Sequence, residues 1–508
     1  MNESEHAGRL QGCAPTNILE LLKSSNKIAL IQGKKRISYE ALLDRGVRFG
    51  GRLRREGIGA GQYVLVFVPL SIELYTAMIG AWSIGAVPIF IDFSRGAKFV
   101  NDSIRRLRPD MIICDPITGF VRNIYAQMRR IKMLKINQSD QPVDIVKLKA
   151  GHPAILTFTS GSTGIPKVAV RTHEFLVNQY NALTAYLDFD ENHVDLGTLP
   201  VFTLANLASN MTTLLPDKNY LSKINARRLS AKMDSERVTR AICSPALMER
   251  LLAYSSLPSL KCAYLGGGPV YPRLLEKIRK SVDIRIVYGS TEAEPIASVR
   301  WIDVSPEDRQ KIAAGAGLLV GDVVPEVACR ISAEKEILVS GRTVLQGYLD
   351  GIGDKENKIR DGAVVWHRTG DAGYIDEQGR LWLLGRVSQA IHDGKGTLYP
   401  FCIECVLDAH FGIRGAILSH KGERIVVIEE GITNPDDVLN RLKPFHIMSV
   451  IAIKKIPMDK RHGAKIDYRR LLETLESKLY GKPHVMQSRI LHSKLSICQP
   501  NNYNYCLT

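Results

Sequence analysis

Short apolar runs alternate with longer segments of mixed polarity along most of the chain. From residue 63 to residue 91 the only charged side chain is Glu73, and Pro69 and Pro88 interrupt the apolar stretch. A membrane-spanning helix would need about 20 uninterrupted apolar residues. The pattern instead predicts buried strands over 64–68 and 87–91 with a helix over 71–84 between them, as in a β-α-β unit with parallel strands.

The alternation continues through the second half of the chain. Strands are predicted over 154–159 and 284–288, and short strands separated by glycine turns follow between 337 and 386. A smaller unit comes next, with a helix over 400–410 and strands over 416–419 and 424–429. We therefore expect an α/β protein with a large N-terminal domain of layered β-sheets and helices (1–386), a small α+β C-terminal domain (387–490) and a frayed tail (491–508).

The composition fits a globular protein with more than one domain. The chain has 508 residues, of which 45% are hydrophobic and 24% charged. Its net charge of +16 suits polyanionic ligands or contact with an anionic membrane surface, and that second alternative stays open. The basic residues between Arg129 and Lys135 are interpreted as a solvated helix face. No nucleic-acid-binding module is present, so we expect no nucleic-acid partner.

Cysteine usage favours a reducing compartment. The nine cysteines are scattered, and the chain opens on polar and acidic residues rather than on a secretory signal. We therefore expect reduced thiols and a cytoplasmic protein. Cys402 and Cys405 form a C-x-x-C pair without a second pair at zinc spacing, so we interpret them as small apolar residues on the inner face of a helix.

A loop rich in glycine and hydroxyl residues follows the strand predicted over 154–159. It reads Thr159, Ser160, Gly161, Ser162, Thr163, Gly164, Ile165, Pro166, Lys167. Glycines let backbone N–H groups approach an anion, hydroxyls add donors, and the lysine supplies a positive charge. The spacing differs from a Walker A loop. The loop therefore predicts a distinct phosphate-binding site.

The order T-S-G-S-T-G-x-P-K resembles the adenylate-forming superfamily of acyl-CoA synthetases, luciferases and peptide-synthetase adenylation domains. Further motifs follow in the family's order over about residues 17–475, namely Gly266-Gly267-Gly268-Pro269, Tyr288-Gly289-Ser290-Thr291-Glu292, Gly347-Tyr348, Thr369-Gly370-Asp371 and Gly385-Arg386. The resemblance implies an adenylate-forming large domain. It also implies activation of a small-molecule carboxylic acid with ATP.

The resemblance implies a role for each motif. Glu292 is expected to hold Mg²⁺, for which a carboxylate oxygen is a suitable ligand. Thr291 is expected to donate to the α-phosphate, and Asp371 to accept hydrogen bonds from the ribose. Tyr288 would face the adenine beside Gly266–Gly268, and Arg386 would lie near the ribose. The predicted catalytic residues are Lys465, Thr291 and Glu292. Gly289 and Ser290 complete the predicted nucleotide site.

The lysine motif near the C-terminus departs from the common pattern. Relatives read P-x-x-x-x-G-K, whereas here Lys465 lies two positions later and Ala464 precedes it. The ending K-I-D assigns the catalytic role to Lys465, with Lys460 as the competing candidate. The stretch Arg461–Lys465 resembles the R-H-x-A-K variant of the olefin-biosynthesis β-lactone synthetases.

Other departures bear on the acid and on the acceptor. Relatives that make CoA esters often carry His where Thr203 stands, and Ser388 replaces the usual hinge residue. The stretch 202–210 has no acid to hold an amino group, so an apolar or fatty acid is expected. The expected second step is transfer to CoA, as in fatty-acid–CoA ligases. The two alternatives are closure of a 3-hydroxy fatty acid to a β-lactone without CoA, and non-catalytic adenylate binding. No carrier-protein sequence follows, so a free-standing enzyme is expected.

Overall fold

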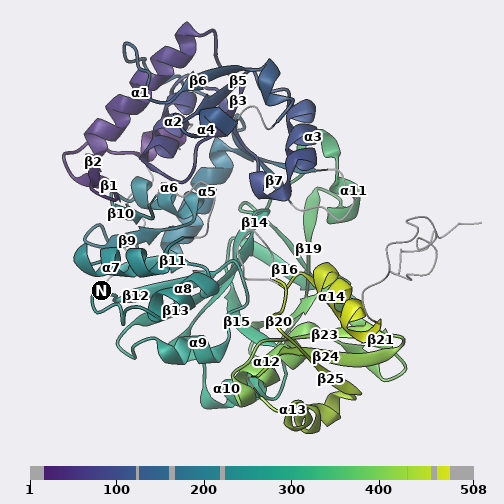
Figure 1. Cartoon of the computed structure of the whole chain (residues 1–508). Helices are drawn as coiled ribbons and strands as arrows, with labels where there is room; N and C mark the ends of the chain where they lie inside the picture. The colour runs from purple at the N-terminus through teal and green to yellow at the C-terminus, as the bar shows by residue number, and fades with distance from the viewer. Residues whose placement is uncertain are drawn as a thin grey trace, which may run out of the picture.

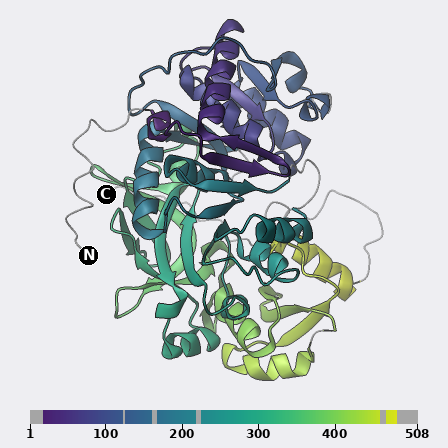
Figure 2. The same cartoon turned by 90° about the vertical axis from the view of Figure 1, so that its left-hand side faces the viewer.

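The computed structural model describes residues 17–121, 125–159, 166–217, 224–431, 433–458 and 466–480. The first third of the chain forms one end of the molecule and the C-terminal unit forms the other, as two perpendicular views show (Figures 1 and 2). Between them the middle of the chain builds one extended sheet. The expected α/β class, with layered sheets in a large unit and a small α+β unit after it, is confirmed.

The N-terminal end contains a six-stranded sheet in the described part of the chain. Its strands, in spatial order, are β6 (Lys132–Lys135), β5 (Met111–Cys114), β3 (Tyr63–Phe67), β4 (Val87–Phe90), β7 (Pro153–Thr159) and β8 (Lys167–Thr172). All neighbours are parallel except β7 and β8. Alternate residues of β3 face opposite cores: Val64 and Val66 pack with α1 (Tyr39–Arg55) and α2 (Ile72–Ser83), and Leu65 and Phe67 with α3 (Ala97–Leu107).

A second sheet of 14 strands runs through the middle of the described structure. Its main path is β16 (Val327–Ile331), β17 (Glu336–Gly341), β19 (Val364–Ile375), β20 (Leu381–Arg386), β15 (Leu318–Val323), β14 (Ala293–Arg300), β13 (Asp283–Ser290), β12 (Cys262–Gly266), β11 (Arg240–Cys243), β9 (Val194–Gly197), β10 (Thr212–Leu215), β1 (Ile28–Gln32) and β2 (Lys35–Ser38), with β18 (Lys358–Asp361) beside β19. Strands β1 to β13 along this path are parallel, and from β13 to β16 the pairing is antiparallel. The change occurs at the β13–β14 hairpin, which carries a predicted site motif.

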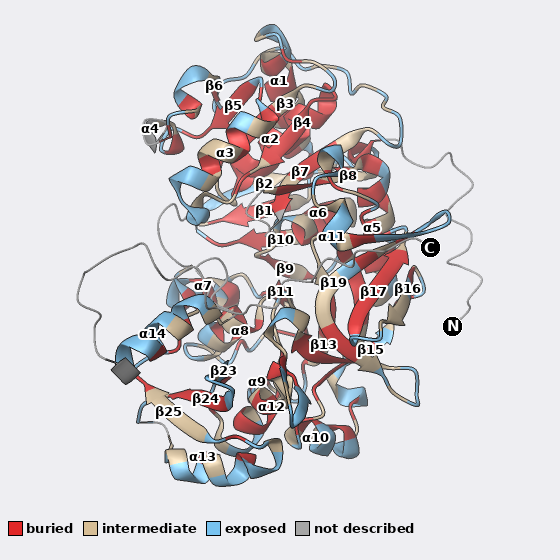
Figure 3. Ribbon diagram, turned by 90° about the vertical axis from the view of Figure 1, so that its right-hand side faces the viewer, coloured by how far each residue is buried: buried red, intermediate tan, exposed pale blue. Residues whose placement is uncertain are grey.

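Helices cover these sheets, so that most strands are buried while the outer helix faces are exposed (Figure 3). Besides α1 to α3, the large unit contains α4 (Thr118–Val121), α5 (His173–Tyr186), α6 (Pro200–Ala208), α7 (Ala226–Ser235), α8 (Pro245–Leu252), α9 (Pro272–Lys277), α10 (Pro306–Ala313) and α11 (Asp354–Asn357). Helix α2 is buried along its whole length because it packs against the sheet and α1. No described helix is long and apolar enough to span a bilayer.

The C-terminal unit is built on a three-stranded sheet in the described residues. It contains β21 (Ile391–Asp393), β22 (Gly396–Leu398), α12 (Pro400–Phe411), β23 (Gly415–His420), β24 (Glu423–Glu429), α13 (Pro435–Leu442), β25 (Ser449–Ile453) and α14 (Tyr468–Tyr480). Helix α12 packs on β20, α9 and α10 of the large unit. As predicted, Cys405 is buried on α12, and Cys402 is partly buried. The division after residue 386 stays a prediction.

The predicted β-α-β unit is confirmed by β3, α2 and β4. One interpretation was wrong for the lysines: the basic residues from Arg129 to Lys135 do not share a helix face. Arg129 and Arg130 lie exposed on a short 3-10 helix (Met128–Arg130), whereas Lys132–Lys135 forms β6 at the edge of the six-stranded sheet. Strand β6 lies at the edge of the sheet and fully buries only Leu134, so Lys132 and Lys135 are exposed to solvent.

Candidate active site

One cavity of about 2260 Å³ is bounded by both large sheets and by the C-terminal unit. Part of its wall is apolar and includes Leu70, Leu74, Met78, Phe90, Phe202 and Leu204. The predicted site residues from Lys167 onward that the structure describes all line it, namely Lys167, Gly266, Gly267, Gly268, Tyr288, Gly289, Ser290, Thr291, Glu292, Asp371 and Arg386. Segments far apart in the sequence therefore meet at one cleft with a polar and an apolar part.

The glycine-rich turn and the Tyr288–Glu292 turn follow the carboxyl ends of the neighbouring parallel strands β12 and β13. This edge of an open α/β sheet is the usual place for a ligand. A Cβ at Gly266 would lie 2.6 Å from the Val287 carbonyl oxygen, so only glycine permits this approach. Gly267 has a φ of +75°, which also favours glycine. Glycine is therefore required at 266 by the close approach of β13 and favoured at 267 by the backbone conformation.

Asp371 joins three parts of the polar wall. The Tyr288 hydroxyl donates to Asp371 Oδ2 at 2.9 Å, and Arg386 Nε lies 3.1 Å from Oδ1. Asp371 and Arg386 face each other across β19 and β20, and Arg386 Nη1 donates to the Thr369 carbonyl at 3.0 Å. Burial, together with the nearby Asp371 charge, raises the pKa of Tyr288 far above its usual range. The phenol therefore keeps its proton and holds the carboxylate in place.

Glu292 and Lys167 share a second polar corner. The Tyr348 hydroxyl donates to Glu292 Oε1 at 3.0 Å, and Lys167 Nζ lies 5.2 Å from the centre of the Tyr348 ring. Lys167 Nζ also donates to Asn357 Oδ1 at 2.9 Å. Burial lowers the pKa of Lys167, while Glu292 opposes that change. One carboxylate beside a lysine suits a magnesium ion held mainly by phosphate oxygens.

Several predicted residues lie outside the described part of the chain. These are Ser160, Gly161, Ser162, Thr163 and Gly164 of the phosphate loop, and both candidate lysines, Lys460 and Lys465. The flanks of the loop are described: Thr159 ends β7 and pairs with Lys167 at the start of β8. The flanks of the lysine segment, Met458 and Ile466, form a β-bridge and line the cleft. The roles of all these residues stay predictions.

The C-terminal unit contributes a half-buried carboxyl group, that of Glu404, at the cleft. Glu404 Oε2 accepts a hydrogen bond from the Tyr271 hydroxyl of the large unit. Tyr468, close to the lysine segment in sequence, donates to Glu404 Oε1 at 3.4 Å. Burial raises the pKa of Glu404 to about 7. Glu404 therefore connects the beginning of α14 to the large unit.

Sequence reasoning missed three polar side chains beside the cleft. Glu294 and Arg171 line it, and Gln179 Nε2 donates to Glu294 Oε2 at 3.4 Å. Burial raises the pKa of Glu294 to about 7, and the Arg171 charge opposes this rise. Arg171 and Glu294 are ionisable residues in strands whose other residues are mostly apolar. This contrast is the sequence signal that could have identified them.

Thr203, the residue whose identity bears on CoA transfer, does not face the cleft. Thr203 is completely buried on α6, and a Cβ added to Gly197 would lie 2.5 Å from its hydroxyl oxygen. Its neighbours Phe202 and Leu204 line the cavity instead. In this structure the residue type at 203 is therefore a matter of core packing.

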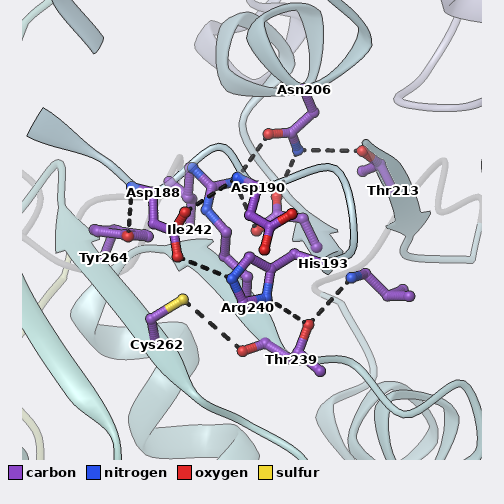
Figure 4. A network of polar contacts seen from close by, with 12 residues as sticks. Asp188, Asp190, His193, Asn206, Thr213, Thr239, Arg240, Ile242, Cys262 and Tyr264 are labelled. Atoms are coloured by element: carbon purple, nitrogen blue, oxygen red, sulfur yellow. Dashed lines mark hydrogen bonds and ion pairs between the residues drawn. The ribbon is translucent and has the colours of Figure 1, made fainter. Parts of the chain in front are cut away.

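A separate polar network lies at the start of β11 and β12 (Figure 4). His193 shares hydrogen bonds of 2.9 Å with Asp188 Oδ2 and 2.8 Å with the Thr239 hydroxyl. The ligand atoms of Asp188, His193 and Cys262 lie within 4.8 Å of one another. The side chains already have partners within the network, since the Tyr264 hydroxyl accepts from the Asp188 backbone N–H at 2.8 Å and the Cys262 thiol lies 3.9 Å from the Thr239 carbonyl oxygen. We therefore interpret this network as structural.

Replacing Asp371 with asparagine should raise the KM for ATP by about 10- to 100-fold, with a smaller change in kcat. In the predicted ribose contact an amide would offer no negative charge to the ribose hydroxyls or to Arg386, and hydrogen bonds to charged groups are worth about 1.5–3 kcal/mol. Pyrophosphate release measured against ATP concentration tests this. Asp322→Asn is the control, because Asp322 is exposed on β15 of the same sheet. An unchanged KM for ATP in Asp371→Asn would contradict the ribose assignment.

The sequence of the chain is similar to those of known proteins. The family model described as AMP-binding enzyme matches residues 21–349. The olefin beta-lactone synthetase of Xanthomonas campestris is 28% identical, over 86% of this chain and 90% of that protein. The 2-succinylbenzoate–CoA ligase of Bacillus licheniformis is 25% identical, covering 76% of this chain and 82% of the relative.

The fold has close counterparts among solved structures. ATP-bound MatB from Rhodopseudomonas palustris superimposes with a TM-score of 0.76 at 21% identity, covering 92% of this chain and 100% of that one. MenE of Bacillus subtilis, in complex with AMP, has a TM-score of 0.75 at 19% identity and covers 89% of this chain. At these identities the likeness concerns the fold alone.

Proposed function

The chain belongs to the AMP-binding enzyme family, and from this premise we propose that it activates an apolar carboxylic acid whose own hydroxyl group accepts the activated acyl group. The protein is an ATP-dependent, AMP-forming acid ligase. The choice of acid and the choice of acceptor are the proposed parts. The product would be a β-lactone, formed without CoA from a 3-hydroxy fatty acid.

The shape of the cleft carries this proposal. The polar wall at Tyr288, Asp371 and Arg386 and an apolar wall that includes Leu74 and Met78 belong to the same cavity. A nucleotide needs the first and a hydrocarbon chain needs the second. The R-H-x-A-K stretch at 461–465 and the relatives named olefin beta-lactone synthetases support an internal acceptor.

In the proposed reaction a carboxylate oxygen of the acid attacks the α-phosphorus of ATP, and pyrophosphate leaves with the electron pair of the broken P–O bond. Lys465 and Thr291 would neutralise the charge that develops on the phosphate oxygens. Magnesium held by Glu292 would offset the charge of the leaving pyrophosphate. Asp371 and Arg386 would fix the ribose, so that positioning supplies most of the catalysis.

In the second proposed step the hydroxyl oxygen of the acid attacks its own activated carbonyl carbon. The bond from that carbon to the AMP oxygen breaks, AMP leaves, and the hydroxyl proton passes to solvent. We further propose that the C-terminal unit, from residue 387 onward, rotates about Arg386–Ser388 between the two steps. The contacts that Glu404 makes with Tyr271 and Tyr468 would belong to the adenylating arrangement.

Transfer to CoA is the second candidate, favoured by relatives that are named CoA ligases. ATP–pyrophosphate exchange and product analysis with long-chain fatty acids and their 3-hydroxy forms, each with and without CoA, separate the two. We expect exchange with both acids, and a β-lactone from the hydroxy acid without CoA. A product that requires CoA would replace the lactone proposal with the CoA proposal. Absence of exchange with every acid would favour the non-catalytic alternative.

A further inference from the structure

Two ionisable side chains interrupt the wall of the cleft near its apolar part. Arg171 comes from β8 and Glu294 from β14, and both line the same cavity as Leu204 and Val201 of α6. Gln179 of α5 stands behind Glu294 and borders a small neighbouring cavity together with the same two apolar residues. These contacts place the carboxyl group of Glu294 beside the wall proposed to receive the acid.

The polar atoms of this group are incompletely paired within the described residues. The Glu294 carboxyl receives one long hydrogen bond, 3.4 Å from Gln179 Nε2. Gln179 is 2% exposed, and its Oε1 has no described partner. Arg171 is 5% exposed, and its Nε also lacks a described partner. Buried polar atoms usually find partners. Because Gln179 Oε1 and Arg171 Nε are closed to solvent, the part of this group open to a ligand is the half-buried Glu294 carboxyl, which lines the cavity and can accept further hydrogen bonds.

The position of Arg171 locates the group relative to the reaction. Arg171 Nη2 donates to the Thr291 carbonyl oxygen at 3.0 Å. Thr291 and Glu292 form the turn at which the nucleotide phosphates are proposed to bind. A ligand group between Arg171 and Glu294 would therefore belong to the carboxyl end of the acid rather than to the far end of its chain.

The charges of Arg171 and Glu294 limit which chemical groups could bind between these two side chains. Arg171 and Glu294 act on each other electrostatically, and these two described side chains form no ion pair with each other. When Glu294 is ionised the two charges are opposite, so an ammonium or a second carboxylate would be attracted by one side chain and repelled by the other. A neutral hydroxyl, which can donate to a carboxylate and accept from a guanidinium, matches both sides.

We propose that Glu294, supported by Gln179 and Arg171, binds a hydroxyl group close to the carboxyl end of an otherwise apolar acid substrate. This inference rests on the proposed function, since it concerns the acid that is adenylated. It makes Glu294 a specificity-determining residue that positions the hydroxyl.

The test compares 3-hydroxydodecanoate with dodecanoate in ATP–pyrophosphate exchange, using the full chain and the variants Glu294→Gln and Glu294→Leu. We expect the wild type to prefer the hydroxy acid. Glu294→Leu should lower kcat/KM for the hydroxy acid by about 10- to 100-fold, the range for loss of a hydrogen bond to a charged group. The loss with dodecanoate should be much smaller, and Glu294→Gln should retain part of the preference.

Glu377→Gln serves as the control, because Glu377 is exposed in the turn between β19 and β20. An equal loss with both acids in Glu294→Leu would overturn the inference and indicate a structural role. A wild type without preference between the acids would also overturn it, while the proposed adenylation would stand. Stronger exchange with 3-aminododecanoate would overturn the choice of a hydroxyl. No exchange with any acid would instead count against the proposed function itself.

Discussion

Replacing Lys465 with alanine should lower ATP–pyrophosphate exchange by about 10²- to 10³-fold, the usual loss when one preorganised donor is removed from a transition state. The ammonium group is proposed to lie between the attacking carboxylate and the α-phosphate, where negative charge accumulates as pyrophosphate leaves. Binding of ATP should change little, because the ribose and magnesium ligands proposed here belong to other segments. Exchange assays and equilibrium binding of ATP measure the two effects separately.

Lys460→Ala is the matched control, since it removes the same charge from the same segment. We expect it to retain nearly all exchange activity. If Lys460→Ala abolished exchange and Lys465→Ala did not, the assignment of the catalytic lysine would be wrong. Equal losses in both variants would indicate that the segment needs its total charge and has no single catalytic lysine.

The local elements around the cleft are predictable because burial acts on short stretches of sequence. Strand β3 alternates between two cores, so five consecutive apolar residues suffice to identify it. The Tyr288–Glu292 motif is predictable for another reason. Gly266 beside it allows a backbone approach that any side chain would block, and a Cβ at Gly289 would lie a tight 3.0 Å from the Ala293 carbonyl oxygen, so the need for glycine is visible as residue type.

Other features depend on partners that are distant in sequence. Glu294 reads as an ordinary strand residue until Gln179 and Arg171 are seen beside it, 115 and 123 positions earlier. Arg240 likewise lies in a short apolar strand, and its only visible peculiarity is its charge. Lys132–Lys135 was misinterpreted because a four-residue edge strand and a helix turn expose lysines equally well. In each of these three examples, contacts with residues distant in sequence decide the role of the side chain, and the local sequence pattern does not contain those contacts.

Replacing Asp195 with alanine should destabilise the protein by about 3–5 kcal/mol, the range for breaking a buried ion pair by removing one partner. Asp195 and Arg240 are both fully buried, with Oδ1 and Nη1 3.1 Å apart. Asn206 connects them, since its amide donates to Asp195 Oδ2 at 2.6 Å. Its carbonyl oxygen accepts from Arg240 Nη1 at 2.9 Å (Figure 4). Burial raises the pKa of Asp195, and Arg240 opposes that rise. Without the carboxylate, the guanidinium charge would be buried with only neutral partners.

Urea unfolding of Asp195→Ala, of Asp44→Ala and of the double variant Asp195→Leu/Arg240→Met separates this effect from a general loss of packing. Asp44 pairs with Arg48 on the exposed face of α1, so its loss should be much smaller because solvent screens surface pairs. The double variant should be more stable than Asp195→Ala, because it removes the uncompensated charge and keeps the volume filled. If the double variant were the less stable of the two, the ion pair and its Asn206 bridge would themselves stabilise the fold, beyond avoiding a buried charge. A loss in Asp195→Ala no larger than in Asp44→Ala would mean that water reaches Arg240, contrary to its complete burial between the Phe189 and Tyr264 rings.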